Sequence, residues 1–69
     1  MNAANKARLE RMTEREKVDW LFRTLSDAAV ISVALSDEEK SEEFRKAINA
    51  LRRATDEYMD EVLEKEEVA

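Results

Sequence analysis

Apolar residues recur every three or four positions through the second half of the chain, which is the spacing of one buried stripe on an amphipathic helix. The stripe comprises Phe44, Ala47, Ile48, Leu51, Ala54, Thr55, Tyr58, Met59 and Val62. The other sides carry charged residues, several in opposite-sign pairs at helical spacing, such as Arg52 with Asp56. This pattern predicts a helix over about residues 37–66 with a single buried face.

The first half of the chain differs because its apolar residues form two stripes on one helix. The stripe expected to pack on the second helix comprises Val18, Leu21, Phe22, Leu25, Ala28, Ala29, Ser32, Val33 and Leu35. At about 100° per residue, a further stripe lies on roughly the opposite side. It comprises Leu9, Met12, Trp20, Ile31 and Ala34, with Val30 at its edge. A two-helix monomer covers only one stripe, so the other is predicted to meet another chain or to remain an exposed binding patch.

Capping signals indicate where the helices begin. Thr13 precedes Glu16 by three residues, and Ser36 precedes Glu39 in the same way, which is the spacing of a capping box. Ser36 also follows an apolar run and precedes three acidic residues, which favour the positive end of a helix dipole. We therefore place the turn at about residues 35–37.

The length of the first helix depends on how Thr13 is interpreted. We expect one continuous helix over about residues 3–35, because both arms then have matched lengths of roughly 45 to 50 Å. The alternative is a short helix, a kink near Thr13 and a new helix from Glu14.

The 69-residue chain contains no glycine, proline, cysteine or histidine. Average usage would give about eight Gly and Pro residues, which punctuate loops and turns, so their absence predicts a nearly all-helical chain. The β-branched content of residues 28–35 leaves a strand there as a minor alternative. A chain this short is marginal alone, and it has neither disulfides nor the usual zinc ligands for reinforcement. We predict an all-α, two-helix antiparallel hairpin that dimerises into a four-helix bundle, with one domain over residues 1–69.

Charge is distributed unevenly. Residues 1–23 hold six basic and four acidic side chains, a net charge of +2, whereas residues 55–69 hold one basic and seven acidic side chains, a net charge of −6. In an antiparallel hairpin these ends lie side by side, so the polarity is expected to orient the hairpin and keep its surface solvated. The alternative is an acidic tail that imitates nucleic acid.

The missing residue types also restrict chemistry. Loops that cradle phosphate need glycine, and the di-metal sites of helical bundles use Glu-x-x-His. Serine and threonine residues lack a plausible general base to activate them. We therefore expect no enzymatic activity, no cofactor, no metal and no small-molecule ligand. The charged N-terminal region shows no export signal, so a cytoplasmic location is expected.

The remaining function classes are forms of macromolecular binding. The chain resembles the plasmid copy-number Rop family in size and layout, which implies an RNA-binding four-helix bundle. Against this, the bases of residues 6–17 are interleaved with acids, and the isoelectric point is about 4.7. A protein partner is favoured, because Trp20 is the single tryptophan and tryptophan is enriched at interface hot spots. Trp20 and Ile31 either seal the homodimer or contact that partner.

The whole chain also resembles very small, acidic, all-helical phage proteins that dimerise and inhibit host regulators. The likeness covers length, the lack of Gly and Pro, and the two helices around Thr13-Glu14-Arg15-Glu16 and Ser36-Asp37-Glu38-Glu39. In particular, it resembles phage anti-quorum-sensing proteins, which are anti-activators of a LuxR-type transcription factor and also interfere with the type IV pilus assembly ATPase. The resemblance implies a homodimeric inhibitor acting in the host cytoplasm, without identifying its binding residues.

Such an inhibitor has two physical routes to its partner. An apolar ridge around Trp20 could compete for a groove on the activator. Alternatively, acidic residues could cover the activator's basic DNA-reading surface. The acidic candidates near the turn are Asp37, Glu38, Glu39, Glu42 and Glu43.

Overall fold

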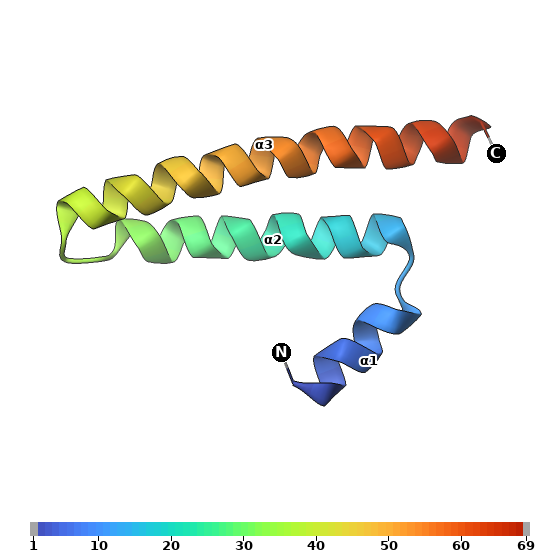
Figure 1. The fold of residues 1–69 in the computed structure, drawn as a ribbon, viewed down its shortest axis with the longest axis horizontal. Helices are drawn as coiled ribbons and strands as arrows, with labels where there is room; N and C mark the ends of the chain where they lie inside the picture. The colour runs from blue at the N-terminus through green and yellow to red at the C-terminus, as the bar shows by residue number, and fades with distance from the viewer. Residues whose placement is uncertain (1, 69) are drawn as a thin grey trace.

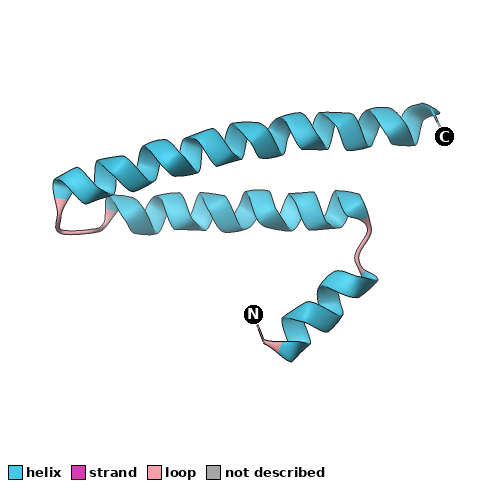
Figure 2. Cartoon of the chain, viewed as in Figure 1, coloured by secondary structure: helices cyan, strands magenta, loops and turns pink. Residues whose placement is uncertain are grey.

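The computed structural model, which describes residues 2–68, consists of three helices: α1 (Ala3–Arg11), α2 (Glu14–Val33) and α3 (Glu38–Val68). Helices α2 and α3 lie antiparallel as a hairpin, and α1 leaves the start of α2 and turns back beneath it (Figure 1). Loops are confined to the helix junctions and the N-terminal end, and residues 2–68 contain no strand (Figure 2). The predicted all-α class is confirmed.

The predicted continuous first helix over residues 3–35 is wrong, because the chain leaves helical conformation at Met12 and Thr13. Their ψ angles are 146° and 164°, in the extended range. Thr13 Oγ1 accepts a hydrogen bond from the Glu16 amide at 3.2 Å, and Glu16 Oε1 accepts one from the Thr13 amide at 3.0 Å. This reciprocal capping box stabilises a new helix start in place of an unbroken helix. The structure therefore has the alternative arrangement, with a second helix from Glu14.

The predicted turn at residues 35–37 falls within the loop between α2 and α3, but its cap lies one residue later than expected. Asp37 Oδ1 accepts a hydrogen bond from the Lys40 amide at 3.0 Å, and the Asp37 carbonyl accepts one from the Ser41 amide at 2.9 Å. Asp37 rather than Ser36 therefore caps α3. A carboxylate at this position also interacts favourably with the helix dipole, which a serine hydroxyl does less well.

Small side chains occupy the buried positions of the contact between α2 and α3. Within residues 2–68, the buried apolar residues are Val18 and Val62, and the buried polar residues are Ser32 and Thr55. Each of the two buried hydroxyls donates to a carbonyl of its own helix at 2.8 Å, so neither needs a partner across the contact. Ser41 Oγ donates to the Ser32 carbonyl at 2.6 Å and ties the helices together near the turn. Burial of a valine contributes roughly 1.5–3 kcal/mol, which makes this a thin core.

Acidification should loosen the start of α2. Hydrogen bonds from Thr13 lower the pKa of Glu16 below its ordinary value of 4.5. The bond from the Thr13 backbone amide has the larger effect, and the bond with its hydroxyl has the smaller one. Ionised Glu16 therefore stabilises the capping box above pH 4.5, and this contribution is lost as the pH falls through the lowered pKa. We expect the Thr13 amide resonance to shift and its hydrogen exchange to accelerate over that range in NMR spectra.

The control for this titration is Glu16→Gln, which keeps an oxygen acceptor without an ionisable group. In this variant, the resonance position and the hydrogen-exchange protection of the Thr13 amide should hardly change over the same pH range. A Thr13 amide that titrates equally in both proteins would contradict the assignment to Glu16.

Candidate functional site

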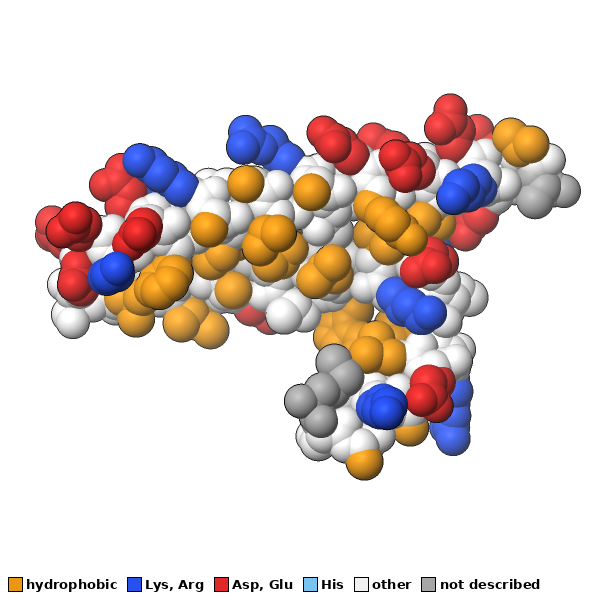
Figure 3. Space-filling model, in the orientation of Figure 1, with side chains coloured by type: hydrophobic (Ala, Val, Ile, Leu, Met, Phe, Trp, Pro, Cys, Tyr) orange, Lys and Arg blue, Asp and Glu red, His pale blue; other side chains and the backbone are white. Residues whose placement is uncertain are grey.

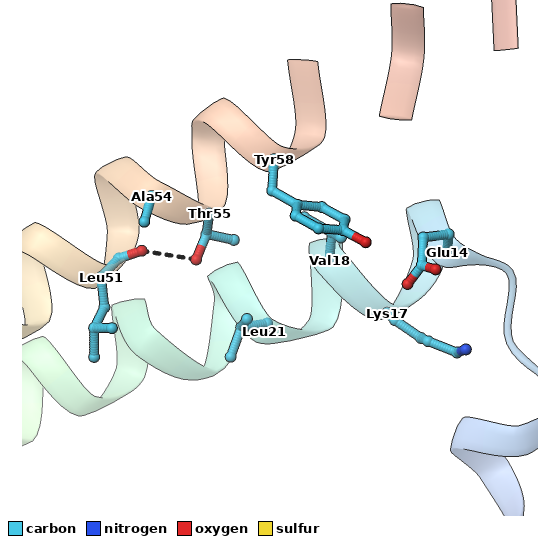
Figure 4. Close-up of a pocket in the computed structure, with 8 residues that line it drawn as sticks. All are labelled: Glu14, Lys17, Val18, Leu21, Leu51, Ala54, Thr55 and Tyr58. Atoms are coloured by element: carbon cyan, nitrogen blue, oxygen red, sulfur yellow. Dashed lines mark hydrogen bonds between the residues drawn. The ribbon is translucent and has the colours of Figure 1, made fainter. Parts of the chain in front are cut away.

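An open apolar groove runs along one flank of the contact between α2 and α3. It is lined by Glu14, Lys17, Val18, Leu21, Leu51, Ala54, Thr55 and Tyr58 (Figure 4). The groove has a volume of about 390 Å³. Its large apolar walls are half open to solvent, with exposed fractions of 51% for Leu21, 55% for Leu51 and 45% for Tyr58. Glu14 and Lys17 lie together at one end of it (Figure 4).

A seven-residue repeat extends this apolar surface along α3. Phe44, Leu51 and Tyr58 are seven residues apart and all exposed, with Ala47 and Ala54 between them. Residues at this spacing lie on one side of a helix and form the seam of helical bundles. We call Phe44, Ala47, Leu51, Ala54 and Tyr58 the α3 stripe. Hydrophobic side chains also gather along the visible face of the hairpin in Figure 3.

A neighbouring repeat on α3 faces the hairpin contact. Ile48, Thr55 and Val62 are also seven residues apart, and they are half-buried, buried and buried, respectively. The broad apolar stripe of the sequence therefore divides in two. The part centred on Thr55 is buried against α2, and the α3 stripe borders that contact and stays exposed.

The opposite flank of the contact is covered by long charged side chains. The Arg52 guanidinium carbon lies 5.1 Å from the centre of the Phe22 ring, so its apolar stem shields that ring. Arg15 and Glu66 form a 3.7 Å ion pair between α2 and α3. The predicted pairing of Arg52 with Asp56 is wrong, because no such ion pair occurs within residues 2–68 and Arg52 Nε is buried without a hydrogen-bond partner.

Trp20 lies at the corner where α1 turns back toward α2. The Arg8 guanidinium carbon is 4.7 Å from the centre of the Trp20 ring, within cation–π range. Trp20, Leu9 and Met12 are all half-buried. Figure 3 shows hydrophobic side chains where α1 meets α2. We call Leu9, Met12 and Trp20 the Trp20 corner.

The predicted stripe of Leu9, Met12, Trp20, Ile31 and Ala34 is not one continuous face. The break at Thr13 takes Leu9 and Met12 off the axis of α2, and Arg8 is the α1 residue that lies over the Trp20 ring. Ile31 is 65% exposed and Ala34 is exposed, and both lie at the other end of α2. The structure therefore leaves Leu9, Met12 and Trp20 half-buried near the junction of α1 with α2, and it separates Ile31 and Ala34 from them.

The acidic residues Asp37, Glu38, Glu39, Glu42 and Glu43 lie at the turn and the start of α3, and all are exposed. Asp37 is used as the helix cap. Glu43 pairs with Lys40 at 3.1 Å, and Glu42 pairs with Lys46 at 3.4 Å. Solvated pairs of this kind contribute about 0–1 kcal/mol and partly neutralise the local field.

The fold and these surfaces define a small all-helical protein whose candidate site is an apolar groove beside a helix–helix contact. Comparisons with protein-family models, curated proteins and solved structures gave no match. Within residues 2–68, no three Asp or Glu side chains are grouped so as to hold a metal ion. No helix in this range has both the length and the apolar character needed to cross a membrane.

Arg8→Ala should uncover the Trp20 ring. A cation–π contact at an exposed site contributes about 0.5–1 kcal/mol, so its loss should raise the open population of the corner roughly two- to fivefold. The single tryptophan makes this measurable as an increase in acrylamide quenching of the intrinsic fluorescence. Arg11→Ala, which removes an arginine from the same helix, is the matched control. Equal quenching in the two variants would contradict a specific role for Arg8.

Proposed function

We propose that this chain forms a homodimeric four-helix bundle and acts by binding and inactivating a bacterial regulatory protein. The exposed α3 stripe is the observation that carries the proposal. A single hairpin with two buried valines has little apolar core, and it leaves a regular bundle-type stripe uncovered. Such a stripe is the surface by which helices associate.

A second copy of the chain is the partner that this stripe fits best. The stripe alternates large residues, such as Leu51 and Tyr58, with the alanines 47 and 54, so helices can interdigitate and approach closely. Leu21 of α2 completes the groove between the two helices. Two hairpins that bury this face against each other would form an isologous dimer, in which the same patch serves both subunits. The opposite flank, covered by Arg52 and the ion pair of Arg15 with Glu66, would stay in solvent.

The Trp20 corner is the proposed contact with the regulatory protein. Dimerisation through the α3 stripe occupies the groove, and it leaves the corner accessible because Trp20 does not line that groove. Tryptophan and arginine are the residues most enriched at interface hot spots, and Trp20 and Arg8 are adjacent here. The resemblance to phage anti-quorum-sensing proteins supports a LuxR-type activator as the partner, with the type IV pilus assembly ATPase as a further candidate.

Two other functions remain as alternatives with different physical signatures. A Rop-like RNA-binding bundle would use basic side chains on its helices, and an acidic nucleic-acid mimic would use the carboxylates around Asp37 or the C-terminal end. The turn carboxylates of Glu42 and Glu43 already pair with lysines, which weakens mimicry at that end. Both alternatives predict a steep dependence on salt.

Leu51→Glu should convert the dimer into monomers. The substitution places a charge in the centre of the proposed interface, where its desolvation is costly. Sedimentation equilibrium should give twice the chain mass of 8.0 kDa for the wild type and a single chain for the variant. Val30→Glu is the matched control, because Val30 is 73% exposed and lies off the groove. A monomeric wild type, or a dimer that tolerates Leu51→Glu, would refute this interface.

Trp20→Ala should weaken binding to a purified LuxR-type activator while leaving the dimer intact. Removal of a hot-spot tryptophan costs about 2 kcal/mol or more, which is roughly a thirtyfold loss of affinity by calorimetry. Wild-type binding should survive about 0.5 M salt, because apolar contacts are not screened. The matched variant Glu38→Gln/Glu39→Gln should bind normally.

The alternatives give opposite results in the same experiment. Steep loss of binding with salt, together with weakened binding by Glu38→Gln/Glu39→Gln, would assign the contact to charge mimicry. Binding of structured RNA at physiological salt, with no binding to the activator, would support the Rop-like function instead.

A further inference from the structure

We infer that the Met12–Thr13 junction is a two-position hinge. In the observed position α1 is folded back beside Trp20. In the second position α1 lies in line with α2 and runs along the C-terminal end of α3. The hinge is a property of the free chain, and only its consequence for Trp20 depends on the proposed function.

The helix lengths provide the first argument. Helix α3 has 31 residues and α2 has 20, and α3 extends past α2 at both ends of the hairpin (Figure 1). The difference of 11 equals the nine residues of α1 plus the two junction residues. An unbroken helix over residues 3–33 would match α3 in length. Its residues before α2 would lie beside the part of α3 that extends past the start of α2 (Figure 1), and its first residues would run beyond the end of α3.

The backbone at the junction needs little change to reach that position. Met12 and Thr13 have φ angles of −84° and −69°, which already lie in the helical range. Only their ψ angles, 146° and 164°, must rotate to about −42°. The helical form has no proline or glycine to accommodate, because the chain contains neither. It would exchange the two capping-box hydrogen bonds of Thr13 and Glu16 for backbone hydrogen bonds of a continuous helix.

Charge favours the in-line position. Residues 3–11 hold three basic side chains and one acidic side chain, a net charge of +2, and residues 60–68 hold five acidic side chains and one basic, a net charge of −4. The ion pair of Arg15 with Glu66 already joins the adjoining turns of α2 and α3. In line, α1 would continue this contact between a basic helix and an acidic one. In the folded-back position, α1 contacts α2 through the Arg8 guanidinium, which lies over the Trp20 ring.

The hinge changes what the protein displays around Trp20. In an unbroken helix, Leu9 and Met12 precede Trp20 by 11 and eight residues, close to three and two helical turns, so the three form one apolar ridge. Folded back, α1 instead places Arg8 over the indole and leaves all three residues half-buried. The in-line position would thus present the three residues as a ridge along one helix, whereas the folded-back position presents them as the Trp20 corner with Arg8 over the indole.

A distance between the chain ends tests the hinge directly. The native chain has no cysteine, so Ala4→Cys/Glu67→Cys gives two unique positions for nitroxide spin labels. Labelled protein diluted in excess unlabelled protein removes distances between subunits. Electron paramagnetic resonance should show a long separation, as the ends lie far apart in Figure 1. It should also show a short one, because packed helices lie about 8–10 Å apart.

Two variants should move this equilibrium in opposite directions. Proline suits the first position of α2 and keeps the preceding Thr13 extended, but it disrupts an unbroken helix. With Glu14→Pro, the population with the short separation should therefore fall about a hundredfold. Thr13→Ala/Glu16→Ala removes the capping box and should raise the population with the short separation about fivefold. The control Thr24→Ala/Asp27→Ala deletes a hydroxyl and a carboxylate at the same spacing within α2, and it should leave that population unchanged.

Circular dichroism of each labelled protein checks that α2 and α3 remain folded. A single long separation in the wild type and in Thr13→Ala/Glu16→Ala would overturn the hinge. A short separation that survives Glu14→Pro would also overturn it. Activator binding is measured separately, so its absence would reject the proposed function and leave the hinge result standing.

Discussion

The close contact between α2 and α3 is the constraint on which the rest of the structure depends. Its buried positions are held by valine, serine and threonine, which let the two helices approach closely but contribute little apolar burial. The bulkier residues Leu21, Leu51 and Tyr58 consequently lie beside the contact instead of within it. A hairpin built in this way has its larger apolar surface outside its own core. This is the surface that the proposed dimer would cover.

The two flanks of this contact are chemically different, and the difference determines which flank meets the second copy in the proposed dimer. On one flank, Arg52 lies over Phe22, and Arg15 pairs with Glu66, so long side chains already cover the apolar atoms. On the other flank, the residue one position earlier, Leu51, has no such cover. Adjacent residues on a helix point about 100° apart, so this single step in sequence separates the flank covered by charged side chains from the flank proposed to associate.

The sequence was sufficient for the all-helical class, because periodicity and the lack of glycine and proline both indicate helices. It was insufficient for the groove, because a broad apolar stripe does not say which part a neighbouring helix covers. That depends on the rotation and separation of α2 and α3, which small residues such as Thr55 determine. The division into two seven-residue repeats, one through Leu51 and one through Thr55, was the available signal. The break at Thr13 was signalled by its capping box, but matched arm lengths favoured a continuous helix.

That conflict between a local signal and a global one is itself informative about function. The capping box of Thr13 and Glu16 favours a new helix start, whereas the length and the acidic end of α3 favour a longer, more basic helix beside it. Natural sequences usually make such signals agree, and disagreement tends to occur where a protein has more than one conformation to stabilise. Here it falls beside Trp20, next to the surface that dimerisation would leave free. A chain with few loops can change its surface only by making or breaking a helix, and the Met12–Thr13 junction is where this chain can do so.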